Sequence, residues 1–333
     1  MKGFLLIFIV LICAGCSKRA IIKPVINPVV IDADPPPQAV AAGYTYLAFR
    51  DEFNSDEGID MNNTGNPGYN FYRRRPFGYP VLDRDRLSVS NGMLILNSQT
   101  PGPNLGIVSI ARQNGQTDGW TGFTARDGAY FEARISFDGK PSGTGLPAGQ
   151  SVGWPSFWSM AAEHLYGNAK EWIECDFFEM FFLLHSPYYG GVLHKWVLPN
   201  KDVANNESNM LVEAGVVNWS EFKTMGTLWT TGPGSTVDFY YNDQLKTVNP
   251  LTGSPWEFGN EQSWPVILGS DNWPMRVDFV RVWTKPPLED GAIYEIKPVN
   301  AADKTFIGDP NPDFIYGLNS VLRYKGFEFT LFL

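Results

Sequence analysis

The chain has 333 residues and a formal net charge of -9, with 26 Lys and Arg against 35 Asp and Glu. This acidic balance argues against binding nucleic acid or an anionic membrane surface through bulk electrostatics. Hydrophobic residues make up 44% of the chain, which is enough for a sizeable core, and the 11 Trp are more than packing alone usually requires. The composition favours a neutral or locally recognised ligand, and the excess of Trp suggests surfaces for stacking.

The first 16 residues have the pattern of a lipoprotein signal peptide. Lys2 precedes an apolar run from Phe4 to Cys13 that is too short to span a bilayer, and small residues stand directly before Cys16. This pattern resembles a bacterial lipobox, in which Cys16 is acylated and becomes the mature N-terminus. An ordinary secretory signal is the alternative. We therefore expect secretion across the inner membrane and anchoring in the outer membrane, at the cell surface or on the periplasmic face.

Composition divides the rest of the chain into three parts. Residues 17–43 are rich in Pro and Ala without helical or strand periodicity, which indicates an extended tether. Residues 44–287 alternate apolar and polar side chains in short runs, separated by turns such as Asn91-Gly92 and Asn242-Asp243. The run from Met275 to Trp283 alternates for a whole strand. This middle part predicts an all-β domain, a β-sandwich of the jelly-roll type.

Three acids lie inside an otherwise apolar strand, in the run EWIECDFFEMFF at residues 171–182. Alternation places Glu174 and Asp176 on one face, but Glu179 reaches that face only if a β-bulge at Phe177-Phe178 absorbs one residue. Carboxylates lined up on one face raise one another's pKa and are costly to bury. Retaining glycosidases need such a pair, one ionised to attack the anomeric carbon and one protonated to release the leaving group. A solvent-facing acidic strand is the alternative, and the apolar flanks argue against it.

The bulged E-x-D-x-x-E run resembles the signature of glycoside hydrolase family 16, in which Ile, Leu or Val usually stands at the place of Cys175. Four other segments resemble that family's strands in the same order. The five segments are FRDEF at 49–53, GAYFEAR at 128–134, GWPSFW at 153–158, ECDFFE at 174–179 and VDFVRVW at 277–283. The resemblance implies a concave carbohydrate cleft and an endo-acting retaining mechanism. It makes Glu174 the nucleophile, Asp176 its partner and Glu179 the acid/base.

Candidate substrate-binding residues surround these acids. Trp154 and Trp158 share a strand face if their segment is extended, and we expect at least one to stack on sugar rather than to pack in the core. His194 resembles the family's His-Trp position near the cleaved bond, and Trp196 is a further candidate for the cleft. Arg74 belongs to the one basic cluster, which would recognise a sulfate or uronate if it is not simply solvated or salt-bridged.

No cofactor is expected for catalysis, because no Cys and His pattern predicts zinc and no Gly-rich phosphate loop is present. The resemblance implies a possible structural calcium ion on the convex face, with Asp278 as its matching ligand. An ordinary exposed acid is the alternative. We expect a monomer whose partners are a polysaccharide and, through the lipid, the outer membrane.

Residues 288–333 follow a Pro286-Pro287 break and resemble a segment of the TonB-dependent importers of outer membranes. We interpret them as an importer-like remnant or tail. Together these observations predict a hydrolase of internal β-glycosidic bonds, acting on a β-1,3-glucan or on a β-galactan such as agar or carrageenan. A non-catalytic surface glycan-binding lipoprotein and a transglycosylase are the alternatives.

Overall fold

The structure is a computed structural model of the chain. It describes residues 33–74, 82, 84–96, 105–112, 120–137, 155–165, 170–180, 187–199, 201–211, 217–232, 234–247, 251–252, 262–270, 274–286, 319–324 and 327–332. Cys16, most of the predicted tether and Trp154 lie outside these ranges.

The described residues form mainly strands. The helical segments are α1 (Pro37–Ala41), η1 (Asp56–Gly58), η2 (Arg84–Arg86) and α2 (Ala162–Leu165). The strands are β1 (Tyr46–Asp51), β2 (Ile59–Asp60), β3 (Phe71–Tyr72), β4 (Leu87–Ser90), β5 (Met93–Leu96), β6 (Leu105–Val108), β7 (Ile110–Ala111), β8 (Thr121–Gly122), β9 (Ala129–Phe137), β10 (Ser156–Met160), β11 (Glu171–Glu179), β12 (Tyr188–Val197), β13 (Lys201–Leu211), β14 (Lys223–Trp229), β15 (Thr236–Tyr241), β16 (Gln244–Leu245), β17 (Leu251–Thr252), β18 (Ile267–Ser270), β19 (Met275–Thr284), β20 (Asn319–Tyr324) and β21 (Phe327–Phe332).

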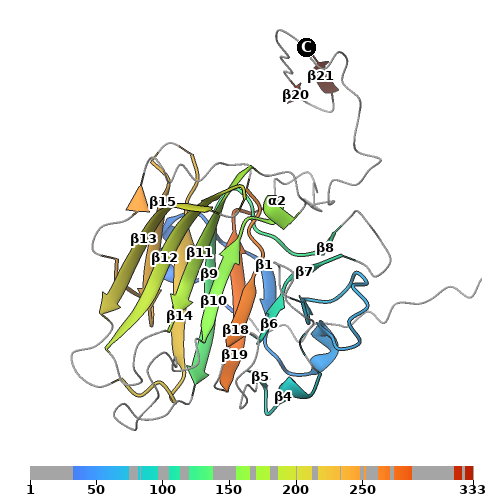
Figure 1. The fold of residues 1–333 in the computed structure, drawn as a ribbon. Coiled ribbons are helices and arrows are strands. Elements are labelled where there is room, and N and C mark those ends of the chain that lie inside the picture. The colour runs from blue at the N-terminus through green and yellow to red at the C-terminus, as the bar shows by residue number, and fades with distance from the viewer. Residues whose placement is uncertain are drawn as a thin grey trace, which may run out of the picture. The chain divides into compact units, whose positions relative to one another are not determined.

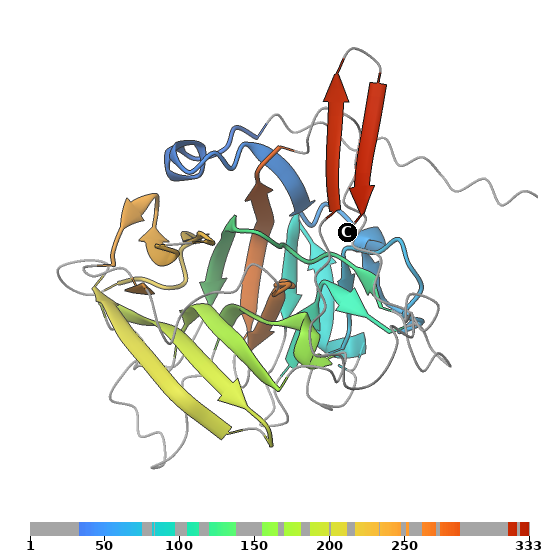
Figure 2. The same cartoon turned by 90° about the horizontal axis from the view of Figure 1, so that it is seen from above.

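Two large sheets make up the domain (Figure 1, Figure 2). The first sheet runs in the order β16-β15-β14-β9-β19-β5-β4, with β1 beside β19 and β17 beside β15. The second sheet runs in the order β13-β12-β11-β10-β18-β6-β3-β2. Strands distant in the chain are neighbours in both sheets, as in β9 beside β19 and β10 beside β18. This pairing confirms the predicted β-sandwich.

The core lies between the two sheets because each strand turns alternate side chains inward. Phe131 of the first sheet stacks on Phe177 of the second, with ring centroids 4.5 Å apart. Trp229 and Trp264 stack almost parallel, with centroids 4.1 Å apart. All four side chains are buried, and they belong to one continuous cluster of apolar residues. Aromatic pairs of this kind add to the burial energy of the core.

The two predicted hairpin turns form as their sequences require. Asn91 and Gly92, between β4 and β5, have φ of 53° and 70°. Asn242 and Asp243, between β15 and β16, have φ of 47° and 62°. Two consecutive residues with positive φ define the type I′ turn that matches the twist of paired strands, and Asn, Asp and Gly tolerate it best.

Two expectations about this domain are corrected. The predicted tether extends to residue 43, yet its end folds as α1, where Ala39 is buried and Gln38 Nε2 donates to the Tyr130 hydroxyl at 2.6 Å. The predicted unbroken alternation of β19 is interrupted by a register shift between Val277 and Phe279. Val277 is therefore buried in the core whereas Phe279 faces outward, where the Arg281 guanidinium covers its ring.

Beyond the sandwich, β20 and β21 pair as an antiparallel hairpin within the predicted tail. Across the described ranges, no helix has the length and apolar character needed to cross a membrane.

Candidate active site

Strand β11 carries the three predicted acids in the middle of the second sheet. Its residues Ile173, Cys175 and Phe177 are buried in the core between the sheets. Glu174 and Asp176, which alternate with them, point to the opposite, outer face of the sheet. The sequence therefore aims these two carboxylates away from the core by strand periodicity alone.

A bulge at Phe177 and Phe178 brings the third acid to the same face, as predicted. The register between β11 and β12 shifts between Asp176 and Glu179, and both Phe side chains are fully buried. On the other side of β11, Asp176 pairs with Trp158 and Glu179 pairs with Ser156. Trp158 and Ser156 are two residues apart on β10 and share a face, so their partners share it as well.

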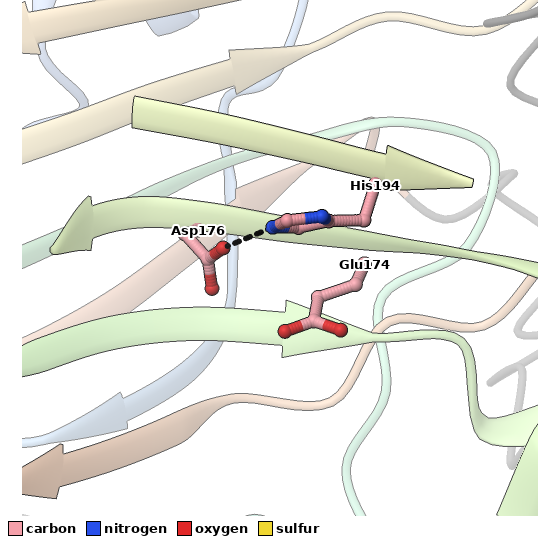
Figure 3. A group of neighbouring side chains, drawn as sticks. All are labelled: Glu174, Asp176 and His194. Atoms are coloured by element: carbon pink, nitrogen blue, oxygen red, sulfur yellow. Dashed lines mark ion pairs between the residues drawn. The ribbon is translucent and has the colours of Figure 1, made fainter. Parts of the chain in front are cut away.

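Strand β12 adds His194 and Trp196 to these acids. His194 lies opposite Glu174 in the register, and its Nε2 is 3.5 Å from Asp176 Oδ2 (Figure 3). The Glu174 carboxylate lies beside this pair in the same view. The indole Nε1 of Trp196 donates to Glu174 Oε2 at 2.7 Å. The structure thus brings together four of the residues predicted for the site, in addition to Glu179.

Burial dominates the electrostatics of the two central carboxyl groups. It raises the pKa of Glu174 to about 8, and the charges of Asp176 and Glu179 act in the same direction. Burial also raises the pKa of Asp176. The positive charge of His194 lowers the pKa of both carboxyls, and the Trp196 hydrogen bond lowers that of Glu174, but neither offsets burial. The Glu174 and Asp176 pair therefore retains a proton to higher pH than two isolated carboxylic acids.

Opposing effects act on His194. Burial lowers its pKa, but hydrogen bonds with Asp176 and Asp202 outweigh burial and raise the pKa to about 9. His194 is therefore an imidazolium at neutral pH, and both ring nitrogens donate.

Ligand atoms of Glu174, Asp176 and His194 lie within 4.8 Å of one another, close enough to share a metal ion. An imidazolium has no lone pair to offer a cation, and metal binding would have to displace its proton. This arrangement fits an ion-pair network better than a metal site.

Apolar and aromatic side chains form the floor beside the acids. Trp158, Met160 and Trp172 belong to a second buried cluster, distinct from the core, and Trp196 packs against it half-buried. Trp158 is only 5% exposed, so its position matches packing in this floor more closely than open contact with a sugar. Trp172 is covered by the His164 ring at a centroid distance of 3.7 Å. Trp120 also packs against this cluster, half-buried.

Arg74 does not lie with these residues in any contact that the structure describes. Its Nε donates to Asn63 Oδ1 at 2.7 Å, and Nη1 donates to the backbone carbonyl of Arg112. The guanidinium therefore connects two segments of the chain. Its contact with substrate stays a prediction.

Asp278 does not fit the calcium ion that the family resemblance implies. Its carboxylate, on the outer face of β19, forms an ion pair with the Arg134 guanidinium. A cation in contact with Asp278 would have to displace or approach this positive charge, which is unfavourable. The described residues assign Asp278 to an ion pair rather than to a metal.

Asp202 is a site residue that sequence reasoning missed. Its Oδ2 lies 2.9 Å from His194 Nδ1, so the imidazolium is held between Asp202 and Asp176. The two residues are only eight positions apart across a turn, which suggests a hairpin contact. A regular pairing of β12 with β13 would nevertheless turn Asp202 to the other face of the sheet. The register shift that prevents this, between Lys195 and Trp196, cannot be predicted from any pattern in the sequence.

Comparison with known proteins identifies solved structures of similar fold. No protein-family model matches the chain. The laminarinase catalytic domain from Thermotoga maritima matches with a TM-score of 0.50 and 16% identity, over 73% of this chain and 99% of that one. An endo-1,3-β-glucanase from Streptomyces sioyaensis matches with a TM-score of 0.50 and 17% identity, over 77% and 100% of the two chains. The structure of BuGH16Bwt matches with a TM-score of 0.50 and 14% identity, over 77% of this chain and 98% of that one.

A separate match concerns a short segment. TonB-dependent receptor P3 from Formosa agariphila is 53% identical over 34 residues, which span 10% of this chain and 3% of the receptor. This match bears out the importer-like resemblance noted in the sequence, for that length of chain. The structural matches, at their low identity, establish a shared fold. They therefore confirm the β-sandwich fold that the resemblance to glycoside hydrolase family 16 implies.

Proposed function

We propose that this protein is an endo-acting, retaining glycoside hydrolase that cleaves internal β-glycosidic bonds of a polysaccharide. The observation that carries the proposal is the outer face of β11, where a bulge aligns Glu174, Asp176 and Glu179. A binding protein would need a separate reason to carry three carboxyl groups on this face, because burying them costs free energy. Paired carboxyl groups on one face are what double displacement requires.

In this mechanism, Glu174 is the nucleophile. Its ionised carboxylate attacks the anomeric carbon while protonated Glu179 donates its proton to the departing glycosidic oxygen. The products of this step are a free sugar end and a glycosyl ester on Glu174. Glu179, now ionised, takes a proton from water, and the resulting attack releases the second sugar and regenerates both groups. Asp176 lies between the two glutamates. The proton that Glu174 and Asp176 hold in common can rest on Asp176, which leaves Glu174 ionised.

The surroundings of Glu174 support this assignment. Burial works against the ionised form, whereas the His194 charge and the Trp196 hydrogen bond favour it. Both favourable contacts come from β12, the strand paired with β11. A nucleophile that is ionised but poorly hydrated is reactive, because it loses little solvation when it forms a bond.

The substrate class is proposed from the aromatic floor and the structural neighbours. Indole rings such as Trp196 offer flat apolar surfaces to sugar rings, and the neighbours of similar fold include a laminarinase and an endo-1,3-β-glucanase. We propose a β-1,3-glucan as the first substrate to test, with β-galactans such as agar and carrageenan as the second class. We also propose a lipid anchor at Cys16. A Cys16→Ser variant could not be acylated there, so we expect it to leave the membrane fraction, in which the unaltered protein should be found.

The test is release of reducing ends from laminarin, mixed-linkage β-glucan, agar, porphyran and carrageenans by the purified full chain. Glu174→Gln preserves the shape and removes the charge, so we expect activity on one polymer that falls by at least about 1,000-fold in the variant. No release from any polymer, with gel-shift binding intact in both proteins, would favour the glycan-binding alternative. Products longer than the substrate would favour a transglycosylase.

A further inference from the structure

Asp202 reaches the active face only through a second bulge. Along β12 and β13, His194 pairs with Asn205 and Lys195 with Ala204, but Trp196 pairs with Asp202 rather than with Val203. The extra residue on β13 moves Asp202 to the face that carries Trp196 and His194. Without this shift Asp202 would point to the other side of the sheet. Val203, the residue that the bulge absorbs, is 46% exposed.

The contact that results completes a chain of charges. Asp202 Oδ2 accepts from His194 Nδ1 at 2.9 Å, and His194 Nε2 lies 3.5 Å from Asp176 Oδ2. With both ring N–H groups directed at carboxylates, the imidazolium ring cannot rotate freely. The side chains of His194 and Asp202 are 18% and 27% exposed, so solvent screens the contact only partly.

We propose that Asp202 is a positioning residue that fixes His194 as an imidazolium against Asp176 and so helps to ionise Glu174. This proposal deepens the proposed hydrolase function and rests on it for the consequence at Glu174. The contact that Asp202 makes in this site is with His194. It acts through His194, in the way that a second carboxylate orients a functional histidine in many sites.

The charges around His194 agree with this assignment. Strand β11 presents Glu174 and Asp176 to the ring, and β13 presents Asp202. On β12 itself, the neighbouring Lys195 is paired with Glu171 at 3.2 Å. Three acids therefore surround one imidazolium, and Asp202 is the one that has no part in the proposed steps of hydrolysis.

The test follows His194 directly. The chain has three His residues, so their ring proton signals are few, and a His194→Gln variant assigns the signal of interest. Asp202→Asn keeps the size and an acceptor oxygen but removes the charge. An opposite charge at this distance shifts a pKa by about 1–3 units, so we expect the His194 titration to fall by at least about one unit in this variant. Asp202→Ser, which is smaller, should give a fall of the same sign.

Glu171→Gln is the matched control. It also removes one negative charge, but from the side chain that pairs with Lys195 instead of His194. We expect it to leave the His194 titration within about 0.3 units of the unaltered protein, well below the shift of a direct partner. If the pKa of His194 were the same in Asp202→Asn, Asp202→Ser and Glu171→Gln, the proposal would be overturned. The experiment needs no substrate, so its outcome is separate from that of the hydrolase assay.

Activity adds a second readout. If His194 is neutral at the assay pH, Glu174 loses the positive charge that favours its ionised form. The acid limb of kcat/KM in Asp202→Asn should therefore move to higher pH, with the plateau nearly restored in alkaline buffer. A uniform loss of activity at every pH, without a shift of the limb, would instead assign Asp202 to structure alone and contradict the proposal.

Discussion

Trp196 Nε1 donates a 2.7 Å hydrogen bond to Glu174 Oε2 from a diagonal position in the β11 and β12 pair. A hydrogen bond to a carboxylate stabilises its charged form, and this one lowers the pKa of Glu174 against the larger effect of burial. The strand register thus sets the ionisation of the proposed nucleophile.

The first prediction concerns the pH dependence of activity. Attack requires ionised Glu174, whose pKa is raised to about 8. Below that pH the ionised fraction falls about tenfold per unit, so kcat/KM should fall as the pH drops from 8 to 6. A profile measured with buffers of constant ionic strength checks this. An acid limb centred near pH 4 would contradict the raised pKa of Glu174 in the free protein.

Replacing Trp196 with Phe tests the hydrogen bond itself. Phe keeps an aromatic ring but donates nothing, so the pKa of Glu174 should rise and the acid limb should move up by about one unit, the equivalent of 1.4 kcal/mol. Trp172→Phe is the matched control, because Trp172 lies opposite Trp196 in the register and its Nε1 has no hydrogen-bond partner among the described residues. A limb that moves equally in both variants would show that the effect is general to the aromatic floor.

The raised pKa also predicts how stability depends on pH. The folded chain holds a proton on Glu174 up to about pH 8, whereas the unfolded chain releases it near the ordinary pKa of a glutamic acid, 4.5. The folded state therefore binds more protons between these values, and the free energy of unfolding falls as the pH rises through this window.

Glu174→Gln should lose this part of the pH dependence. Because Gln is neutral at every pH, the variant should match the unaltered protein more closely at pH 5 and exceed its melting temperature at pH 8.5 by a few degrees, where 1 kcal/mol corresponds to roughly 2–4 °C. Calorimetry at the two pH values checks the difference. Equal pH dependence in both proteins would show that Glu174 has an ordinary pKa.

Leaving-group chemistry separates the two glutamates. An aryl glycoside with an acidic phenol departs without help, so Glu179→Ala should retain most of the rate of bond cleavage on such a substrate while losing about 100- to 10,000-fold on the polysaccharide. Glu174→Ala should lose activity on both substrates, because no nucleophile remains. The burst of phenol released in the first turnover checks the aryl glycoside, because Glu179 is also the base of the second step and its loss slows steady-state turnover; steady-state rates check the polysaccharide. The opposite pattern would exchange the assignments of the two residues.

The bulge is also a stability element. Phe178 is fully buried and its ring lies 5.5 Å from Tyr189 and 5.9 Å from Trp219, measured between centroids. Phe178→Ala should therefore lower the free energy of unfolding by about 3–5 kcal/mol, the range for emptying a buried aromatic position. Leu245→Ala, at a side chain that is 54% exposed, is the control and should change it by less than about 0.5 kcal/mol. Denaturant titration of both variants provides the measurement.

Much of the sandwich is predictable from the chain because its period of two is local. Alternation and the Asn91-Gly92 turn predict strands, and the misfit of Glu179 with that alternation predicts the bulge of β11. The grouping of Glu174 with His194 follows from the family resemblance, and the structure places the two residues opposite each other. These features depend on short segments, which the sequence displays directly.

Other features depend on how separate segments meet. The contact of Asp202 with His194 requires a bulge in β13 that no residue type announces, and the extent of Trp158 burial depends on packing with neighbouring strands. The helix α1 lies where Gln38 donates a hydrogen bond to Tyr130, a residue far along the chain. The partners of Arg74 could not be predicted for the same reason, since they come from loops whose positions the sequence does not display.

Retaining hydrolysis by Glu174 and Glu179 fixes the anomeric configuration of the first product, which can be measured. The polysaccharide that the panel identifies would be hydrolysed inside an NMR tube, and the signals of the new reducing ends followed before mutarotation. We expect β ends to appear first, and we expect the Glu174→Gln variant to produce no new ends. If α ends appeared first, water would have attacked directly, and the assignment of Glu174 as a nucleophile would be wrong.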